Sequence, residues 1–337
     1  MKKIIIIRSP NETVTDNNFK ILENAAKETG LHIVVCNSFK EAIKKSGRTD
    51  LCITSNNSDV LSLTIRRRTN ILFWVQGIVP EESLMRHGNK VRFIILSLLE
   101  KYALLHSRYL AFVSEPMKEH FETKYGLHFD GKYYIFPCFN TELNISAFDN
   151  PNKYKNNYFV YAGGLAVWQC FEKTLDIYKK VEAWGLPCTK LIVLTRDQKK
   201  ATEMIEARNI QNFNTGYTTP DKLPDILKDA KFGFVIREAS PVNSVATPTK
   251  ISTYLSCGLI PIFGESVEAF RRFSEKMKYT VCWDDSKAAY DKLLYFMTTD
   301  INAQQVFKEY ASFFENNYSR ERHTKALCSI IKQLVEE

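Results

Sequence analysis

Residues 246–262 read ATPTKISTYLSCGLIPI, and this stretch joins a helix to a strand. Thr247 is a good helix N-cap, and Pro248 suits the first helical position, where a missing N–H costs nothing. Cys257 and Gly258 end the helix with a glycine signal, and the apolar run LIPIF follows directly. The stretch therefore predicts a helix that leads into a buried strand.

The same alternation of apolar runs and helical patterns extends through the whole chain. The runs of the first half are KIIIIR (3–8), LHIVVC (31–36), DLCIT (50–54), ILFWV (71–75), YLAFVS (109–114) and YYIF (133–136). Those of the second half are YFVYA (158–162), LIVLT (191–195), FGFVI (232–236), LIPIF (259–263) and YTVCW (279–283). Runs that are apolar throughout suit a parallel sheet covered on both faces, and their alternation with helices predicts a doubly wound α/β fold.

Helix signals lie between these runs. Ser38 is followed three residues later by Glu41, which forms a capping box. A long helix is expected over residues 91–106, and another after Ser114. The last helical stretch, residues 319–337, is expected to pack back across both domains.

Length and composition predict two domains. A chain of 337 residues exceeds what one hydrophobic core usually serves. The polar segment FDNPNKYKNNY (148–158) contains Pro and four Asn and is the best linker. We therefore expect an N-terminal domain over residues 1–150, a C-terminal domain over 151–318 and a final helix over 319–337. Open α/β sheets bind ligands beyond the carboxyl ends of their strands, which suggests a ligand between the two domains.

The charge balance favours an anionic partner. The formal net charge is +8, which suits phosphorylated substrates, an anionic membrane surface or nucleic acid. Basic and aromatic residues do not interleave as in a nucleic-acid module, so no nucleic-acid partner is expected. Residues 86–108 are the best candidate for a membrane surface. The alternative is a core helix in which Phe93, Ile94 and Leu98 serve packing.

Cysteine usage and hydropathy predict a cytoplasmic location, and the net positive charge is compatible with a peripheral position on the inner face of the cytoplasmic membrane. The eight cysteines include no CxxC pair, and most lie in apolar runs as free thiols, which points to a reducing compartment. No segment approaches the ~18 apolar residues of a membrane span, and the four isoleucines near the N-terminus are too few for a signal peptide. The six histidines do not cluster in metal-ligand spacing, so no metal is expected.

The strongest candidates for an anion site lie around residues 237–250. Lys250 falls in the first turn of the predicted helix, where a cation opposes the helix dipole. It either meets a bound phosphate together with the free backbone N–H groups, or it reaches away to solvent. Arg237 and Glu238 stand at the carboxyl end of a strand, where Arg can grip a phosphate bidentately. They could equally form a surface pair with ordinary turn residues such as Asn243 after them.

Two weaker candidates follow other strands of the second half. Gly163 and Gly164 form a strand–turn–helix signal in which a backbone can approach a ligand closely. Arg196 belongs to a polar cluster after the strand LIVLT. Neither a GxGxxG nor a Walker motif is present.

The first half offers the segment QGIVPEES (76–83) after the strand ILFWV. Gln76, Gly77, Glu81 and Glu82 would face a ligand from the other side. Glu82 is equally plausible as a first-turn helix carboxylate.

Four motifs in order give the chain a resemblance to a known family. They are VQGIVPEES, EKYALLHSRYLAFVSEPM, YAGGLAVWQC and IRE…N…ATPTKISTYLSCG. Together they look like retaining GT-B glycosyltransferases of the large family 4 group, most of all bacterial members that build capsule, O-antigen or exopolysaccharide. The resemblance spans roughly residues 70–265. It implies two facing Rossmann-like domains, with the nucleotide-diphosphate sugar, UDP- or GDP-linked, in the C-terminal one. A saccharide or lipid-linked acceptor would bind the N-terminal one.

The resemblance also implies roles for particular residues. Donor binding would involve Gly163, Gly164, Arg196, Asn243, Thr247, Pro248, Thr249 and Thr253. Catalysis would involve Arg237, Lys250 and Glu238, and acceptor binding Gln76, Gly77, Glu81 and Glu82. No nucleophile–acid carboxylate pair is identifiable, so catalysis would rest on stabilising the leaving diphosphate.

Departures from the family pattern leave alternatives open. Gly164 and Gln169 stand where the family has an Arg and a Lys, so the positive charge must come from Arg237, Lys250 or Arg196. Thr253 stands where the family has its second glutamate. The chain could therefore be a catalytically degenerate GT-B-like scaffold, and a nucleotide-sugar epimerase of related fold is a further alternative.

Overall fold

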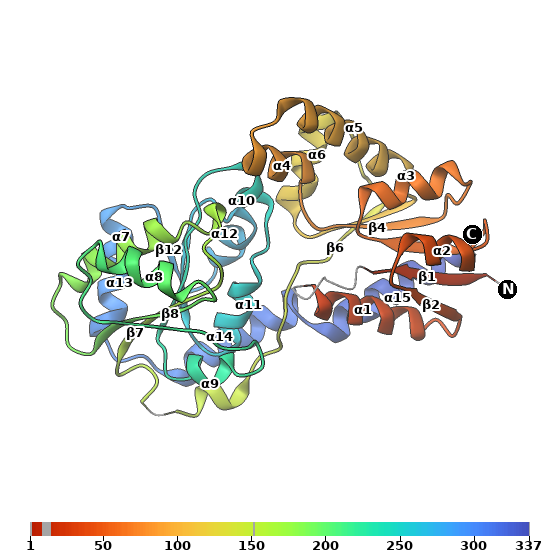
Figure 1. Ribbon diagram of the computed structural model, residues 1–337. Coiled ribbons are helices and arrows are strands. Elements are labelled where there is room, and N and C mark those ends of the chain that lie inside the picture. The colour runs from red at the N-terminus through yellow and green to blue at the C-terminus, as the bar shows by residue number, and fades with distance from the viewer. Residues whose placement is uncertain (1, 9–14, 151, 337) are drawn as a thin grey trace. The chain divides into compact units, whose positions relative to one another are not determined.

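The computed structural model describes residues 2–8, 15–150 and 152–336 (Figure 1). Within these residues the strands form two six-stranded sheets, and every strand pair is parallel. The α/β fold with two doubly wound sheets is confirmed.

The chain divides into two compact units. Unit 1 comprises residues 1–140, 244–247 and 318–337, and unit 2 comprises residues 141–243 and 248–317. These units describe which parts of the backbone lie close together, and they do not show which segments fold as independent domains. The expected domain boundaries after residues 150 and 318 therefore stay predictions.

The sheet of unit 1 has the strand order β2-β1-β3-β4-β5-β6. Its strands are β1 (Lys3–Ile7), β2 (His32–Cys36), β3 (Leu51–Thr54), β4 (Ile71–Val75), β5 (Tyr109–Phe112) and β6 (Tyr133–Ile135). Its helices are α1 (Asp16–Lys27), α2 (Phe39–Lys45), α3 (Asn57–Ile65), α4 (Val79–His87), α5 (Lys90–His106), α6 (Glu115–Tyr125) and α15 (Arg320–Glu336). All residues of β3 and β4 are buried, because α1 and α15 cover one side of the sheet and α3 and α5 the other (Figure 1).

The sheet of unit 2 has the order β12-β11-β10-β7-β8-β9. Its strands are β7 (Asn157–Ala162), β8 (Thr189–Leu194), β9 (Phe213–Gly216), β10 (Phe232–Val235), β11 (Ile260–Gly264) and β12 (Val281–Trp283). Its α-helices are α7 (Phe171–Glu182), α8 (Gln198–Glu206), α9 (Leu223–Leu227), α11 (Thr249–Ser256), α12 (Glu268–Ser274), α13 (Lys287–Thr298) and α14 (Ala303–Asn317). The remaining short helices are the 3-10 turns η1 (Ile145–Phe148) and η2 (Val167–Gln169), and α10 (Pro241–Val245), whose residues belong partly to each unit.

Several helix ends lie where the sequence places them. Ser38 Oγ accepts a hydrogen bond from the N–H of Glu41 at 3.3 Å, and Ser114 Oγ accepts one from Met117 at 3.1 Å. Gly258 has φ +73°, the left-handed conformation expected after a helix C-terminus. The Ser38 cap and the glycine at the helix end are confirmed, whereas Glu41 Oε2 accepts from the N–H of Asn37 at 3.0 Å and not from that of Ser38, as a capping box would require.

The described residues of the polar segment 148–158 belong to unit 2 and pack within it. Lys153 is fully buried, and its Nζ donates to the carbonyl oxygen of Lys228 at 3.0 Å. Tyr154 donates to the carbonyl oxygen of Gly258 at 2.7 Å. Its polar composition therefore reflects buried hydrogen bonds to neighbouring backbone.

The helix α15 packs against α1 within unit 1, and its Leu334 carbonyl oxygen accepts from Asn70 Nδ2 at 2.8 Å. All eight cysteines are free thiols, and the reducing compartment stays a prediction. Among the helices of the described residues, none combines the length and hydropathy needed to cross a membrane.

The interpretation of residues 86–108 as a core helix is wrong for two of the residues that supported it. Ile94 and Leu98 lie on the exposed side of α5, whereas Glu100 of the same helix is buried.

Candidate functional site

The donor-site candidates converge where the strand order of unit 2 reverses. From β7 the chain continues to β8 and β9 on one side, whereas β10, β11 and β12 extend on the other. Parallel pairing of β7 with β10 places their carboxyl ends together, so that Gly163 follows one strand and Arg237 the other. Such a reversal opens a crevice for ligands in doubly wound sheets.

Lys250, in the first turn of α11, reaches toward the end of β7. Its Nζ donates to Gln169 Oε1 at 2.7 Å and lies 4.2 Å from the centre of the Tyr161 ring. The residue keeps some surface exposed, but its ammonium is enclosed by protein. This desolvation, followed by the nearby charge of Arg237, lowers the pKa of Lys250 well below its ordinary value.

Arg237 is the second cation of the site. Its Nη1 donates to the carbonyl oxygen of Trp168, and its own carbonyl oxygen accepts from Ser266 Oγ at 2.9 Å. Burial lowers the pKa of Arg237. The side chain is thus held by a backbone carbonyl and has no ion-pair partner in the described part of the chain.

The charge of these two groups is not compensated. Besides the charge of Arg237, which acts on Lys250, the groups that act on them are Tyr161 and Cys170. None of the described carboxylates is among these groups. Because buried charges are normally paired, two neighbouring cations with neutral partners form a site that is electrostatically suited to an anion.

The glycine turn after β7 is shaped around Lys250. A Cβ atom on Gly163 would lie 2.6 Å from Lys250 Cε, and Gly163 has φ +147°, which L side chains rarely adopt. Gly164 is open, with no atom within 4 Å of such a Cβ, and its carbonyl oxygen accepts from the Tyr161 hydroxyl at 2.6 Å. The first glycine is required by close approach, and the second leaves free space beside it.

The start of α11 differs from the expectation. The helix begins at Thr249 with Pro248 as its N-cap, and no side chain caps it. The prediction of Thr247 as the N-cap is wrong, because Thr247 Oγ1 instead accepts from the N–H of Cys138 at 3.1 Å. No side chain of the N-cap residue closes the start of α11, whose Ile251 N–H donates to the Pro248 carbonyl oxygen at 3.0 Å.

The other donor-site candidates are more dispersed. Asn243 is buried and donates to the carbonyl oxygen of Glu238 at 2.9 Å, whereas Glu238 itself is exposed. Thr253 Oγ1 bonds back to Thr249 within α11 at 3.1 Å. Arg196 is exposed, with its guanidinium 5.7 Å from the Tyr217 ring. Their donor-binding roles stay predictions.

The sequence alone did not identify the two tyrosines that pack at this site, Tyr161 and Tyr254. Tyr161 was predicted only as a strand residue, but its ring packs against the Lys250 ammonium and its hydroxyl donates to the Gly164 carbonyl oxygen. Tyr254 of α11 likewise holds β7, by accepting from the N–H of Ala162 at 3.0 Å. A polar-tipped aromatic at the last positions of a strand was the available signal.

In unit 1, Gln76 and Gly77 follow β4 as expected. Gln76 Nε2 is buried without a hydrogen-bond partner in the described structure. Glu82 Oε1 lies so close to Gly77 that a Cβ atom at this position would clash with it. Burial raises the pKa of Glu82. These three residues therefore form a polar group at the carboxyl end of β4, and their acceptor-binding role stays a prediction.

Glu81 belongs to a different cluster. Its Oε1 lies 2.7 Å from Lys124 Nζ and 3.3 Å from His120 Nε2. Burial opposes ionisation, but these partners outweigh it and lower the pKa of Glu81. Lys124 also lies 3.0 Å from the buried Glu100, so the cluster links α4, α5 and α6. Its contacts give Glu81 a structural role beside the predicted acceptor role.

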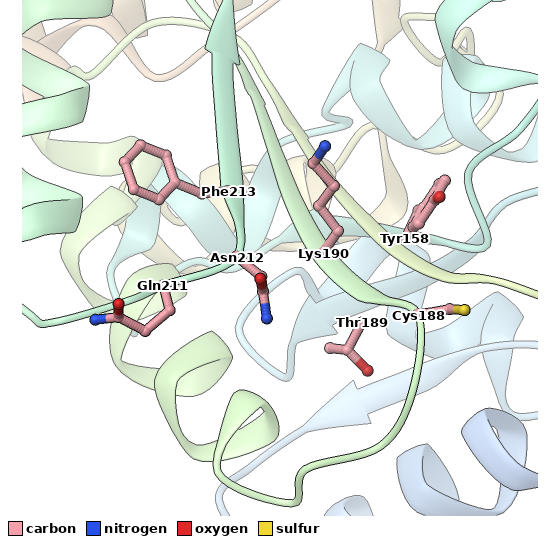
Figure 2. A pocket seen from close by; sticks show the side chains of 7 residues that line it. All are labelled: Tyr158, Cys188, Thr189, Lys190, Gln211, Asn212 and Phe213. Carbon is pink, nitrogen blue, oxygen red and sulfur yellow. The ribbon is translucent and has the colours of Figure 1, made fainter.

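A surface pocket of unit 2 lies at the opposite edge of the sheet. Figure 2 shows its lining residues, which are Tyr158, Cys188, Thr189, Lys190, Gln211, Asn212 and Phe213. These residues stand at or just before the amino ends of β7, β8 and β9. Ligands of doubly wound sheets bind beyond the carboxyl ends, so the cation pair is the better candidate.

Within the described residues, no three His, Cys, Asp or Glu side chains are placed to hold a metal ion. The expected independence from metal stays a prediction.

No protein-family model matches the sequence, and no curated protein matches it either. The structure is similar to that of sucrose-phosphate synthase from Thermosynechococcus elongatus, with a TM-score of 0.73 at 14% identity over 100% of both chains. A glycosyltransferase from Rickettsia africae gives 0.67 at 13% identity, covering 100% of this chain and 99% of the other. An α,α-trehalose-phosphate synthase (UDP-forming) from Burkholderia vietnamiensis gives 0.66 at 8% identity, covering 99% and 100%. At such identities the likeness concerns the fold, which is the expected GT-B class.

Proposed function

We propose that the protein is a retaining glycosyltransferase that takes a sugar from a nucleotide-diphosphate donor. The acceptor would be a saccharide or lipid-linked saccharide in surface polysaccharide biosynthesis. The observation that carries the proposal is the pair of uncompensated cations, Arg237 and Lys250, at the strand-order reversal of unit 2. A diphosphate supplies the negative charge that this pair lacks.

The leaving group explains why this site would suit sugar transfer. When the bond between sugar and diphosphate breaks, negative charge develops on the departing phosphate oxygen. Lys250 and Arg237 are fixed donors for that charge. Donors held in place before the reaction stabilise the transition state, and losing one typically lowers the rate by about 10²–10³.

The neutral hydrogen-bond partners of the two cations are also consistent with a donor site that a nucleotide enters and leaves. Gln169 Oε1 and the Trp168 carbonyl oxygen hold the two cations without neutralising them. A phosphate oxygen can replace either partner with a stronger, charge-assisted hydrogen bond. Gly164 would then let the backbone come close to the donor, since nothing fills the space beside it.

Calorimetric titration with UDP, GDP and ADP tests the donor. UDP is the first choice, because a protein of similar fold is a UDP-forming synthase. We expect one diphosphate to bind in the micromolar range and its nucleoside to bind far more weakly. If none of the three diphosphates binds, the proposed function is wrong.

A second candidate is a scaffold that binds a nucleotide but does not catalyse transfer. Thr253, which stands where the resembling family has a glutamate, bonds back to Thr249 and offers no carboxylate. Nucleotide binding without release of free nucleotide from any donor sugar, with or without acceptor extracts, would favour this scaffold. Release that depends on an acceptor would favour the transferase, and a changed sugar without acceptor would indicate an epimerase.

A further inference from the structure

The helix α5 carries its polar and apolar residues on unexpected sides. Five large apolar side chains of this helix are 55–68% exposed, namely Val91, Ile94, Ile95, Leu98 and Leu105. Its acidic residue, Glu100, is buried and lies 3.0 Å from Lys124 Nζ and 2.7 Å from the Tyr125 hydroxyl. The one carboxylate thus faces the protein, and the isoleucines face outward.

The exposed residues form one continuous stripe. Positions 91, 94, 95, 98 and 105 recur at spacings of three, four and seven, which places them on one face of a 3.6-residue helix. The helices α3 and α4 both pack against α5 (Figure 1), and they too carry exposed apolar residues, namely Ile65, Val79 and Met85. An exposed apolar stripe such as the one on α5 often marks an interaction site.

Cations flank the stripe on both sides. By helical periodicity, Lys90 and Lys101 border one edge and Arg92 borders the other. The exposed N-terminal turn of α5 contributes no acidic residue, and Glu100 is turned inward. The face therefore combines an apolar centre with a positively charged border.

We propose that this face of α5 binds the surface of an anionic lipid bilayer. The isoleucines and leucines would enter the boundary between headgroups and acyl chains, and the bordering cations would contact lipid phosphates. A second copy of the chain fits less well, because a two-fold contact through this face would bring the same cations against each other. The proposal stands apart from the nucleotide site, since its residues belong to unit 1 and those of the cation pair to unit 2.

Vesicle flotation of the full chain tests this proposal. We expect the protein to float with phosphatidylglycerol-rich vesicles, and to float at least ~10-fold less with phosphatidylcholine alone. The double variant Ile94→Ser/Leu98→Ser should lower the recovered fraction at least ~10-fold, because it removes two apolar side chains that would leave water. Lys90→Glu/Arg92→Glu should lower it by a similar factor. The matched control is Ile145→Ser, which removes a similarly exposed isoleucine from unit 2 and should change nothing.

Each outcome decides the proposal. Because the substituted side chains are exposed, all variants should keep the melting temperature and the nucleotide affinity of the parent. Equal recovery with neutral and anionic vesicles, or unchanged recovery in both double variants, would overturn it. So would self-association that Ile94→Ser/Leu98→Ser abolishes without any vesicle binding, which would assign the face to a second copy. Failure to bind nucleotide would contradict the proposed function and leave this proposal standing.

Discussion

The ammonium of Lys250 lies 2.7 Å from the side-chain oxygen of Gln169, a neutral partner for an enclosed cation. An amide oxygen accepts a hydrogen bond but does not cancel the charge. Arg237 adds a second positive charge nearby and further lowers the pKa of Lys250. Without a ligand, the positive charge of Arg237 therefore disfavours the charged form of Lys250, and a bound anion would offset this effect.

Replacing Gln169 with Glu adds a negative charge beside Lys250 at almost the same side-chain size, and so tests whether charge at this position controls diphosphate affinity. The new carboxylate would pair with Lys250 and compete with a diphosphate for the same ammonium. We expect diphosphate affinity to fall about 10-fold, because like charges oppose the ligand, while the melting temperature rises. Gln169→Met, which is neutral and of similar length, is the control and should keep most of the affinity. Tighter diphosphate binding by Gln169→Glu would contradict the assignment.

The two glycines after β7 should respond differently to alanine. Gly163→Ala places a Cβ 2.6 Å from Lys250 Cε at φ +147°, and should destabilise the fold by roughly 1–3 kcal/mol. Gly164→Ala meets no atom within 4 Å and should change stability by less than about 0.5 kcal/mol. Denaturant unfolding measures both. Equal losses in the two variants would show that the close approach at Gly163 is not what requires glycine.

Sequence patterns predicted the strands well because most are buried on both faces. The runs ILFWV and FGFVI coincide with the buried strands β4 and β10, where apolar residues fill every position. The strand β9 was missed, since its residues FNTG lie at a sheet edge and need no continuous apolar run. Pattern reasoning therefore finds a strand where an apolar run marks it, as in the edge strands β2, β6 and β12, and misses one whose sequence has no such run.

The site was predicted less completely, for reasons of geometry. A lysine in a first turn signals an anion, but only the fold shows that Gln169 and Tyr161 enclose Lys250. The expected Thr247 cap failed because its hydroxyl has a partner, Cys138, that is distant in sequence. Glu81 likewise has its partner Lys124 on another helix. Long-range pairing of polar groups leaves no local pattern in the chain.

The cluster around Glu81 should be important for the stability of unit 1. Glu81→Gln removes the charge that faces Lys124, and should cost roughly 3 kcal/mol of unfolding free energy. Glu82→Gln is the control and should change the unfolding free energy little, because burial disfavours the charged form of Glu82 and raises its pKa. The lowered pKa of Glu81 means that its contribution is present above the unfolded-state pKa and is lost as pH falls through the folded-state value.

Urea titrations at neutral and acidic pH measure these differences. If Glu81 also binds the acceptor, the rate of sugar transfer by the folded Glu81→Gln variant should fall, while its affinity for the diphosphate stays unchanged. A loss of diphosphate binding in Glu81→Gln would instead place the donor against unit 1.

Buried lysines of unit 2 should make stability depend on pH. Burial lowers the pKa of Lys231 to about 8 from its ordinary 10.5, so the unfolded state binds more protons between these values. The contribution of Lys231 to stability should therefore rise with pH from about 8 to 10.5, by at most about 3 kcal/mol, whereas buried thiols such as Cys52, whose pKa burial raises, act in the opposite direction. The stability difference between the parent and Lys231→Met should therefore change with pH over this range, whereas the difference between the parent and the exposed Lys228→Met should stay constant. Melting curves across this range give the comparison, and parallel curves for all three proteins would contradict the account.

Calorimetric titration of UDP into the parent protein and Lys250→Met tests the central claim most directly. Methionine keeps the apolar contact with Tyr161 but removes the charge. The account predicts a loss of UDP affinity of about 10- to 150-fold, which corresponds to roughly 1.5–3 kcal/mol for a hydrogen bond to a charged group. Binding of uridine, which has no phosphates, should change little. Unchanged UDP affinity in both Lys250→Met and Arg237→Met would contradict the account and move the diphosphate away from the reversal between β7 and β10.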